Sequence, residues 1–474
     1  MTPFFSSFEV KRTREVLGQT VFAPFNAVNN NKQTTSEEQM KFNKWTLGLA
    51  AVGAVSLVSA ARADEAKMSQ VQTALSDTTI SGYVNTSMNW EWSPSNGSVN
   101  NSPAGNIPLQ NGKANGFNLD VVQLTIAKPQ DESEWATGYQ VSLLFGPDAV
   151  GWNPSANAAS DSSTSYAIQQ AYVALRTPVG NGIDWKVGVF NTIVGYESFD
   201  AGSNPNYTRS WGWAVEPTEN QGILGSYKIN DEFSVSFGVA NTLGTGINNR
   251  NQYDSTSGDV NNSQWHKTLM GSVTFSAPSS WGWAAGSAFY AGIVYGSAGG
   301  TLGPTDTGFT APNGNEVWKQ GTQAGNQANY YLGSTLNSPW KDVTFGAALD
   351  VVQNVGGTSY DITSGDGTGP YFHINDYVGG LYNTIKATDK LSFNSRGEYW
   401  YVQSKGGDEG YCNGVSLTET VQYDLYANIV SRLEFRYDKA TRSIGGSGTY
   451  VLPNGVFIDQ PTSYGIYANM IYKF

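Results

Sequence analysis

The C-terminal end of the chain constrains its fold more than any other segment. Apolar side chains occupy every second position up to the last residue, and polar or small side chains fill most positions between them. The apolar positions are Tyr464, Ile466, Ala468, Met470, Tyr472 and Phe474. A period of two over about ten residues is typical of a β-strand with one apolar face. The chain is therefore expected to end in a strand that is half covered, either by lipid or by a protein core.

The composition narrows the class of protein. Only 14% of the residues are charged, against about 25% in ordinary soluble domains. Glycine (54 residues) and aromatic residues (13%) are abundant, and the mean hydropathy of −0.34 excludes a bundle of transmembrane helices. The net charge of −12 argues against nucleic acid as a partner, because a phosphate-binding surface needs excess basic residues. An all-β protein, and in particular a membrane β-barrel, fits these values best.

Alternation of this kind recurs along the chain and predicts 16 strands, with 14 to 18 as the range. The expected strands are 80–92, 116–127, 136–146, 167–177, 183–190, 221–228, 232–242, 267–276, 281–296, 329–336, 342–353, 376–386, 390–403, 418–428, 430–438 and 463–474. A phase slip between Val121 and Val122 predicts a β-bulge in the second strand. A β-propeller should repeat at a fixed period, and the sequence has no such repeat.

The connections between these strands are predicted to alternate in length. The long ones are 93–115, 147–165, 191–220, 243–266, 297–328, 354–375, 404–415 and 439–462, and the others are short turns such as 178–182 and 277–280. Long loops on one rim and short turns on the other are typical of antiparallel outer-membrane barrels. The pattern therefore predicts a transmembrane antiparallel β-barrel over residues 79–474, with long outer loops, short periplasmic turns and both termini in the periplasm.

Charged strand residues indicate which face of the strands is in contact with water. Most fall on the parity opposite the apolar positions, and we predict that they face the lumen: Glu91, Asp120, Arg176, Asp184, Lys186, Asp350, Arg396, Glu398, Asp424, Arg432, Glu434, Arg436 and Asp438. An Arg or Lys on the lipid face near the bilayer centre would cost about 2–4 kcal/mol. Glu419 shares the apolar parity and is placed at the outer rim. The alternative to a membrane barrel is a soluble β-sandwich, in which the apolar face would form a protein core and the charged residues would face solvent.

The N-terminal region resembles a secretory signal. Lys41 and Lys44 precede an uncharged segment up to Ala61, and Ala61-Arg62-Ala63 is a small-x-small cleavage site. We expect the true start at Met40, a signal peptide over 40–63 with cleavage between Ala63 and Asp64, and a short periplasmic segment over 64–78. Residues 1–39 would then be disordered and lie outside the mature protein. An uncleaved membrane anchor is the alternative.

The third long connection, 191–220, is the candidate pore constriction. It follows the fifth strand and contains four acidic residues and one basic residue: Glu197, Asp200, Glu216 and Glu219, with Arg209. The predicted lumen bases, at 176, 186, 396, 432 and 436, are expected to oppose it, because opposed charges set ion preference at such constrictions. A surface loop with solvated acids is the alternative.

Two resemblances support this interpretation. Phe474 at the end of an alternating strand resembles the C-terminal signature that barrel assembly machinery reads in bacterial outer-membrane barrels. The runs Gly116-Phe117-Asn118-Leu119, Gln170-Ala171-Tyr172-Val173, Gly195-Tyr196-Glu197 and Asn206-Tyr207-Thr208-Arg209-Ser210, with Asn241, resemble the OmpL-like β-barrel porin family. The family implies an outer-membrane channel. In sixteen-stranded general porins, the similarly placed loop folds into the barrel.

The function expected from these features is that of an outer-membrane porin for passive diffusion of small hydrophilic solutes and ions. The alternatives are a solute-specific channel for sugars or anions and a plugged structural or adhesin barrel. The acid excess predicts a mild cation preference that fades at high salt. No GxSxG, HExxH or Walker motif occurs, so we expect no enzyme, no cofactor and no metal. The expected partners are outer-membrane lipid, solutes and the assembly machinery; a homo-oligomer is one candidate assembly.

Overall fold

The structure is a computed structural model. It describes residues 78–94, 102–110, 113–150, 152, 165–244, 246–248, 267–297, 304–310, 316–320, 326–354, 360–361, 371–405, 410–443, 448, 450–453 and 455–474. The expected segments 1–39 and 40–63, the cleavage site at Ala63 and Asp64, and all but the last residue of 64–78 lie outside the described residues. None of the helices in the described part of the chain has the length and apolar character needed to cross a membrane.

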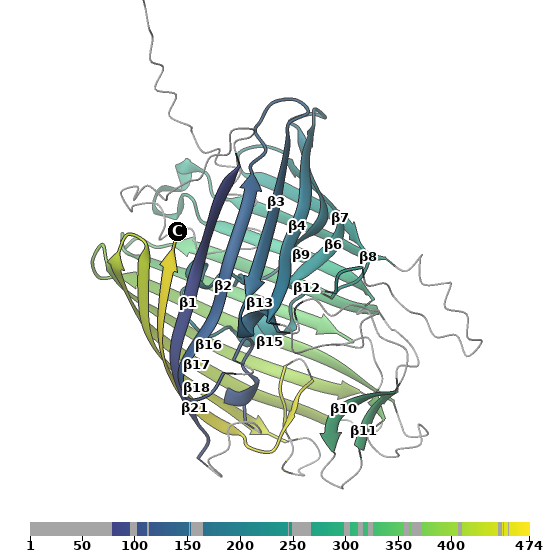
Figure 1. The fold of residues 1–474 in the computed structure, drawn as a ribbon, viewed down its shortest axis with the longest axis vertical. Coiled ribbons are helices and arrows are strands. Elements are labelled where there is room, and N and C mark those ends of the chain that lie inside the picture. Colours follow the sequence, from purple (N-terminus) through teal and green to yellow (C-terminus); the bar gives the residue numbers. More distant parts are fainter. Residues whose placement is uncertain are drawn as a thin grey trace, which may run out of the picture. The chain divides into compact units, whose positions relative to one another are not determined.

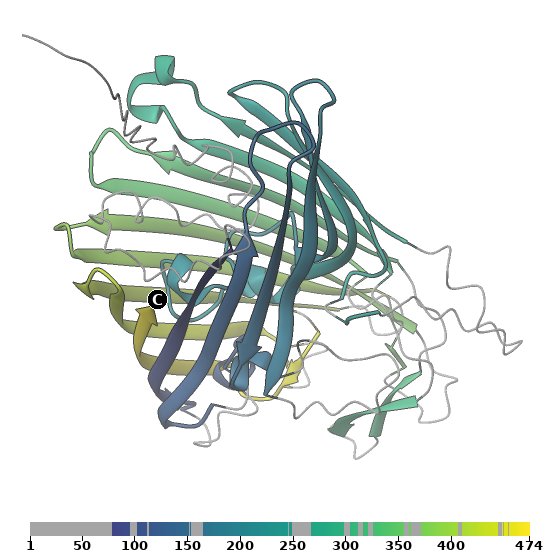
Figure 2. The ribbon, with the colours of Figure 1, turned by 45° about the horizontal axis from the view of Figure 1, so that its top comes forward.

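Sixteen antiparallel strands form a closed barrel, as predicted (Figures 1 and 2). They are β1 (Thr79–Trp92), β2 (Gly116–Lys128), β3 (Thr137–Phe145), β4 (Tyr166–Thr177), β5 (Ile183–Asn191), β6 (Glu219–Lys228), β7 (Phe233–Ala240), β8 (Thr268–Ser276), β9 (Ala288–Ser297), β12 (Asn326–Asn337), β13 (Val343–Gln353), β15 (Tyr371–Lys386), β16 (Leu391–Lys405), β17 (Gly410–Tyr426), β18 (Ile429–Arg442) and β21 (Thr462–Lys473). Each strand pairs with the next in this order, and β21 pairs with β1. Because the barrel is closed, it has no open sheet edge. A lipid environment requires this, since unpaired backbone N–H and C=O groups cannot be satisfied there.

Small elements lie in the connections. The hairpins β10 (Pro304–Thr310) with β11 (Glu316–Gln320), and β19 (Tyr450–Val451) with β20 (Phe457–Ile458), belong to long connections, and β14 (Tyr360–Asp361) pairs with the start of β15. The helices are η2 (Ala104–Asn106), η3 (Pro147–Ala149), η4 (Ala201–Ser203), α2 (Trp211–Val215) and η6 (Ser279–Ala284).

Three details differ from the sequence-based prediction. The turn before β9 is longer than expected, because residues 279–284 form η6 and the strand begins only at Ala288. The connection expected at 404–415 is mostly strand, since β16 and β17 both extend into it. The bulge lies one residue earlier than expected: Asn85 pairs with Val121 and Thr86 with Leu119, which leaves Asp120 as the extra residue.

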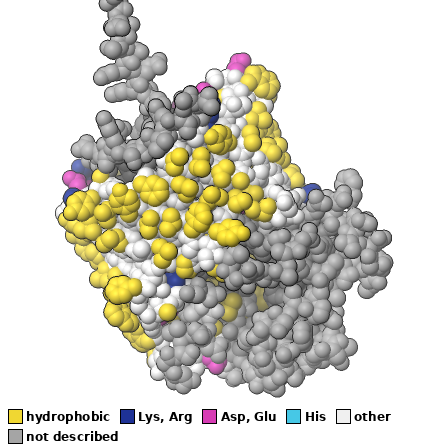
Figure 3. All heavy atoms as spheres, in the orientation of Figure 1, with side chains coloured by type: hydrophobic (Ala, Val, Ile, Leu, Met, Phe, Trp, Pro, Cys, Tyr) yellow, Lys and Arg dark blue, Asp and Glu magenta, His cyan; other side chains and the backbone are white. Residues whose placement is uncertain are grey.

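The two faces of the barrel wall differ in chemistry. Large apolar side chains are exposed on the outer face and form the yellow surface over the strands in view in Figure 3. They include Leu269, Leu332, Leu381, Leu417, Leu433 and Phe435. The opposite parity carries buried polar and charged side chains such as Asp350, Arg396 and Glu434. This alternation is the pattern of a barrel with lipid outside and a polar interior.

Glu419 is an exception on the outer face, and its predicted place at the outer rim was wrong. It lies in the middle of β17, between Leu417 and Val421, and is exposed. The Ser395 hydroxyl on β16 donates a hydrogen bond of 2.8 Å to its carboxylate. A groove of about 620 Å³ beside it has Gly397 and Tyr464 in its wall. A carboxylate here costs less than an Arg or Lys at the same depth.

Candidate functional site: a loop folded inside the barrel

The connection between β5 and β6, residues 192–218, lies inside the barrel and is called the inner loop below. Its two ends are joined where the Thr192 N–H donates to the Thr218 carbonyl at 3.0 Å. Ile193 and Val194 pack in an apolar cluster with Leu224 and Val294 on the wall. Every residue of the inner loop is buried or half-buried. The loop is therefore enclosed along its whole length, and its start is packed against the barrel wall.

Tyr196 marks the point where the inner loop reaches the far wall. Its ring stacks on Tyr382 of β15, with ring centroids 3.8 Å apart. A methyl group at Gly346 on β13 would overlap the Tyr196 hydroxyl, so glycine at this position leaves room for the loop. β5, from which the loop starts, and β16, which it contacts next, are eight strands apart in the sixteen-strand order. The loop thus crosses the interior rather than following one side.

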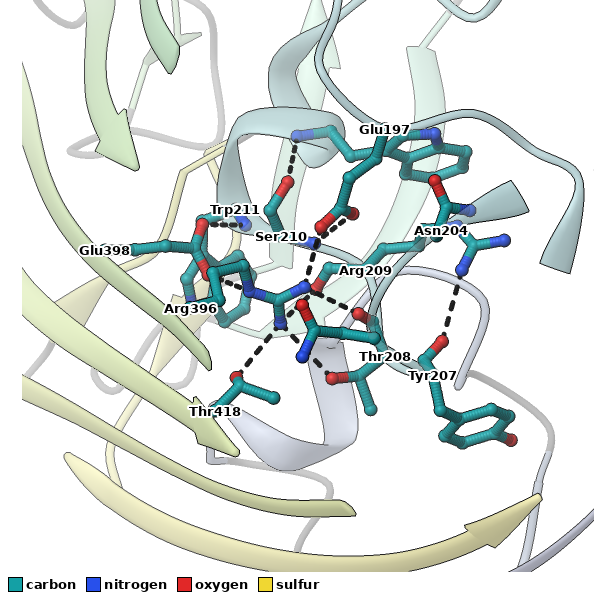
Figure 4. Close-up of polar contacts among 12 residues, drawn as sticks. Glu197, Asn204, Tyr207, Thr208, Arg209, Ser210, Trp211, Arg396, Glu398 and Thr418 are labelled. Carbon is teal, nitrogen blue, oxygen red and sulfur yellow. Dashed lines mark hydrogen bonds and ion pairs between the residues drawn. The ribbon is translucent and has the colours of Figure 1, made fainter. Parts of the chain in front are cut away.

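Arg396 on β16 is the centre of the first polar anchor (Figure 4). Its guanidinium donates to the Glu197 carboxylate and to the Thr208 carbonyl, both at 2.7 Å, and lies 3.0 Å from Glu398. Glu197 also accepts the Ser210 N–H at 2.8 Å, and Glu398 accepts the Trp211 N–H at 2.6 Å. The side chains of Arg396 and Glu197 are 0% exposed. This pair therefore ties both halves of the inner loop to one strand.

A second anchor lies on β18. The Glu434 carboxylate accepts the N–H groups of Tyr207 at 2.6 Å and Thr208 at 3.0 Å. Asp438 accepts the indole N–H of Trp211 at 2.8 Å and pairs with Arg436 at 2.8 Å. The Arg436 guanidinium donates to the carbonyl of residue 209 at 2.5 Å and lies 5.3 Å from the Trp211 ring centroid. Carboxylates that accept several N–H groups in a buried site hold a loop in one conformation.

The turn at the tip of the inner loop is fixed at a third place. Arg432 donates to the carbonyls of Ala201 at 2.9 Å and Asn204 at 2.7 Å. Asp200 accepts a hydrogen bond of 2.7 Å from Gln123 on β2. Burial raises the pKa of Asp200, and the Gln123 hydrogen bond opposes that rise. The tip therefore reaches the seam where β18, β21, β1 and β2 meet.

Two other long connections also reach the inner loop. Trp152 stacks on Trp213 with centroids 6.4 Å apart, and its indole N–H donates to Glu219 at 2.8 Å. Lys113 lies 2.8 Å from Asp148 and 3.1 Å from Asp120, with its side chain 2% exposed. Burial lowers the pKa of Lys113, but the neighbouring carboxylates outweigh this effect and raise it above its usual value. Burial raises the pKa of Asp148 to about 6 despite the Lys113 ammonium.

The predicted site residues divide into two groups. Nine lie within the inner loop or its contacts: Glu197, Asp200, Arg209, Glu216, Glu219, Arg396, Glu398, Arg432 and Arg436. Arg176 and Lys186 lie elsewhere on the wall; Arg176 pairs with Asp184 at 2.7 Å, at the end of β4 near a short turn. All five bases were expected to oppose the loop, and three of them, Arg396, Arg432 and Arg436, are in direct contact with it. Their role in constricting a pore stays a prediction.

Other residues of the anchors were not predicted as site residues. Glu434 and Asp438 were recognised as lumen charges by their parity, but nothing in the sequence indicated that they bind the loop. Lys113 and Trp152 lie in connections without a periodic pattern, so nothing in the sequence indicated that they point toward the inner loop. Among the described residues, no group of three or more His, Cys, Asp or Glu side chains is placed to hold a metal ion.

A closed antiparallel barrel with an apolar outer face, a polar interior and a loop folded inside defines the class of outer-membrane channels. The chain belongs to the family described as "Putative beta-barrel porin-2, OmpL-like", whose model matches residues 77–462. It is therefore a porin of the bacterial outer membrane, as the sequence analysis predicted.

The solved structures to which this chain is similar are distant in sequence. The outer-membrane channel DcaP of Acinetobacter baumannii is 14% identical, with a TM-score of 0.50 over 86% of this chain and 100% of that chain. OmpT of Vibrio cholerae, folded in vitro, is 11% identical, with a TM-score of 0.49 over 86% of this chain and 100% of that chain. An anion-selective porin from Comamonas acidovorans is 11% identical, with a TM-score of 0.49 over 84% and 99%. No curated protein matches the chain.

Proposed function

We propose that small hydrophilic solutes and ions diffuse passively through this porin and that the inner loop forms its narrowest section. The observation that carries the proposal is the fixed position of the loop inside a closed barrel, on anchors from β16 and β18. A polar interior wall solvates ions and sugars, whereas the apolar outer face keeps the barrel in lipid. The proposed function is transport and includes no catalytic activity.

A plugged structural or adhesin barrel is the second candidate, and one observation favours it. The inner loop crosses the interior and has no exposed residue, so it fills much of the section at its own height. A solute-specific channel is the third candidate; lumen-facing aromatic residues such as Tyr83, Tyr382 and Tyr467 suit it, although all three are buried.

Conductance of the purified protein in planar bilayers tests these candidates. A diffusion porin should give stable steps of current, and liposomes containing it should swell with small sugars at rates that fall smoothly with solute size. Absence of current would support the plugged barrel. Swelling with one sugar class only would support the specific channel.

We further propose that Phe474 matters for assembly. The Phe474 N–H donates to the Gly82 carbonyl at 3.0 Å, and the Gly82 N–H donates to the Phe474 carbonyl at 2.9 Å. The Phe474 ring also covers Gly82, where a methyl group would come within 2.9 Å of it. Phe474 thus adds one residue pair, with Gly82, to the pairing of β21 with β1.

Deleting Phe474 should lower the folded, heat-modifiable fraction in outer membranes, because both seam hydrogen bonds and the ring are lost. Phe474→Ala keeps the backbone hydrogen bonds and removes only the ring. It therefore distinguishes the effect of losing the seam hydrogen bonds from the effect of losing the aromatic ring that the assembly machinery would recognise. Phe474→Tyr is the matched control. Normal insertion of the deletion variant would contradict the proposal.

Processing between Ala63 and Asp64 is also proposed, since the basic residues, apolar segment and small-x-small motif all precede that bond. N-terminal sequencing of the mature protein decides it, and a start well before Asp64 would overturn it. Homo-oligomer formation stays a prediction.

A further inference from the structure

The charges of the inner loop cannot supply the ion preference that the sequence suggested. Part of that expectation rested on acids of the loop that face pore water, but the Glu197 side chain is 0% exposed and bound to Arg396, and Asp200 accepts a hydrogen bond from Gln123. Burial, together with the nearby carboxylates of Asp350 and Glu197, raises the pKa of Glu216 well above its usual value. Buried acids that are paired or protonated contribute little field to the pore.

Lys186 on β5 is different from these buried charges. It pairs in register with Ala174 and Leu224, which share its interior-facing parity, and it is half-buried. Among the described residues, no carboxylate lies within ion-pair distance of its ammonium. The acid on the same face of the strand, Asp184, is already bound to Arg176 at 2.7 Å, with both side chains about one-fifth exposed (17% and 20%). This group of three charges therefore keeps one net positive charge.

The surroundings of Lys186 hold its ammonium in the interior. It lies 4.8 Å from the ring centroid of Tyr172 on β4, within the range of a cation–π contact. The Tyr172 hydroxyl donates to the Gln140 amide oxygen on β3 at 3.0 Å, and the Gln140 amide N–H donates to Ser142 at 3.0 Å. The Lys186 ammonium is thus a half-buried cation beside neutral polar groups. It can attract a small anion that does not have to displace a bound carboxylate.

The half-buried acid on the opposite wall has a cation of its own and does not cancel the charge of Lys186. This acid, Asp424, lies two residues from the end of β17, and the half-buried cation Lys473 is likewise at the end of β21. Their opposite charges offset each other at the periplasmic mouth. Lys186 lies in the same half of the barrel, three residues after the start of β5 at Ile183 and five before its end at Asn191, where the inner loop begins.

We propose that Lys186 is a selectivity-determining residue that favours the passage of small anions, such as chloride and short carboxylates, through this pore. The inference rests on the proposed function and deepens it. Tyr172 acts as a positioning residue that keeps the ammonium of Lys186 on the pore wall.

Reversal potentials of the full-length protein in a KCl gradient test the proposal. At about 0.01 M salt the screening length is about 30 Å, so one wall charge influences the pore strongly. Lys186→Gln should lower the chloride-to-potassium permeability ratio about two- to fivefold, since a unit charge at 4 Å in water is worth about 1 kcal/mol. Lys186→Glu should lower it further, and both effects should fade toward 1 M salt.

The control is Lys228→Gln, which makes the same charge change at the end of β6, where Lys228 already pairs with Asp231. Tyr172→Leu should shift the ratio in the same direction as Lys186→Gln but less, and Tyr172→Phe should keep it. Heat-modifiable mobility confirms that each variant is folded. A shift for Lys186→Gln no larger than that of the control, or of opposite sign, overturns the inference while the porin function stands. A wild-type chain that carries no current overturns both.

Discussion

Replacing Arg396 with methionine should free the inner loop and increase the current through the porin. The substitution leaves Glu197 and Glu398 inside the barrel without their cation, and breaking a buried pair from one side costs about 3–5 kcal/mol. The loop would then leave the wall so that both carboxylates reach water. We expect a larger single-channel conductance and faster swelling with larger sugars, with the barrel itself still closed by its backbone hydrogen bonds.

Arg176→Gln is the matched control, because it also removes a lumen arginine from an ion pair, but that pair is partly exposed and distant from the loop. Such pairs are worth at most about 1 kcal/mol. Combining Arg396→Met with Glu197→Gln completes a double-mutant cycle, and a large coupling energy is expected for two groups in contact. If Arg396→Met leaves conductance and size limit unchanged, Arg396 does not hold the loop.

Acidification should tighten the inner loop and reduce the current. Burial, with the neighbouring carboxylates of Asp350 on β13 and Glu197 on the loop, raises the pKa of Glu216. Because the anchored loop prefers the protonated form, its stability is greatest at low pH and declines as pH rises above the ordinary glutamate value of about 4.3 toward the raised value. Asp148, with its pKa raised to about 6, contributes in the same direction.

Single-channel conductance measured from mildly alkaline pH down to about pH 5 checks this expectation. Glu216→Gln is uncharged at every pH, so it should give a low conductance already at neutral pH and a flatter profile. Asp148→Asn tests the contribution of the second acid. A Glu216→Gln variant with the wild-type pH profile would contradict the assignment to Glu216.

The barrel was predictable because lipid and water impose opposite chemistry on alternate residues of every strand. The parity of Leu433 and Phe435 against Arg432, Glu434 and Arg436 fixes the orientation of β18 without any knowledge of its neighbours. Strand ends beyond the bilayer lack that constraint, and the predicted boundaries failed there. β16 and β17 extend into a connection that looked like a loop, and residues 281–284, which were expected to begin a strand, belong to a short helix.

The candidate site was only half predictable for a related reason. Parity indicates that Arg396 and Arg436 point inward, and position after the fifth strand indicates which connection is special. Parity and loop position do not give the distance across the interior. The sequence therefore could not show whether the loop and the bases are in direct contact. Lys113 and Trp152 lie in irregular connections, where no periodicity indicates which way a side chain points.

The anchors of the inner loop also have a consequence for the order of assembly. The loop belongs to the first half of the chain, but its partners follow much later: Glu398 is 187 positions from Trp211, and Arg432 is 231 positions from Ala201. Contacts of such large sequence separation form late, because the intervening chain must first be organised. Until β16 and β18 have entered the sheet, the polar anchors that fix the centre of the loop are missing. A barrel that stalls before its last strands would therefore leave the loop without these anchors, and under the proposed function only a finished barrel acquires its narrow section.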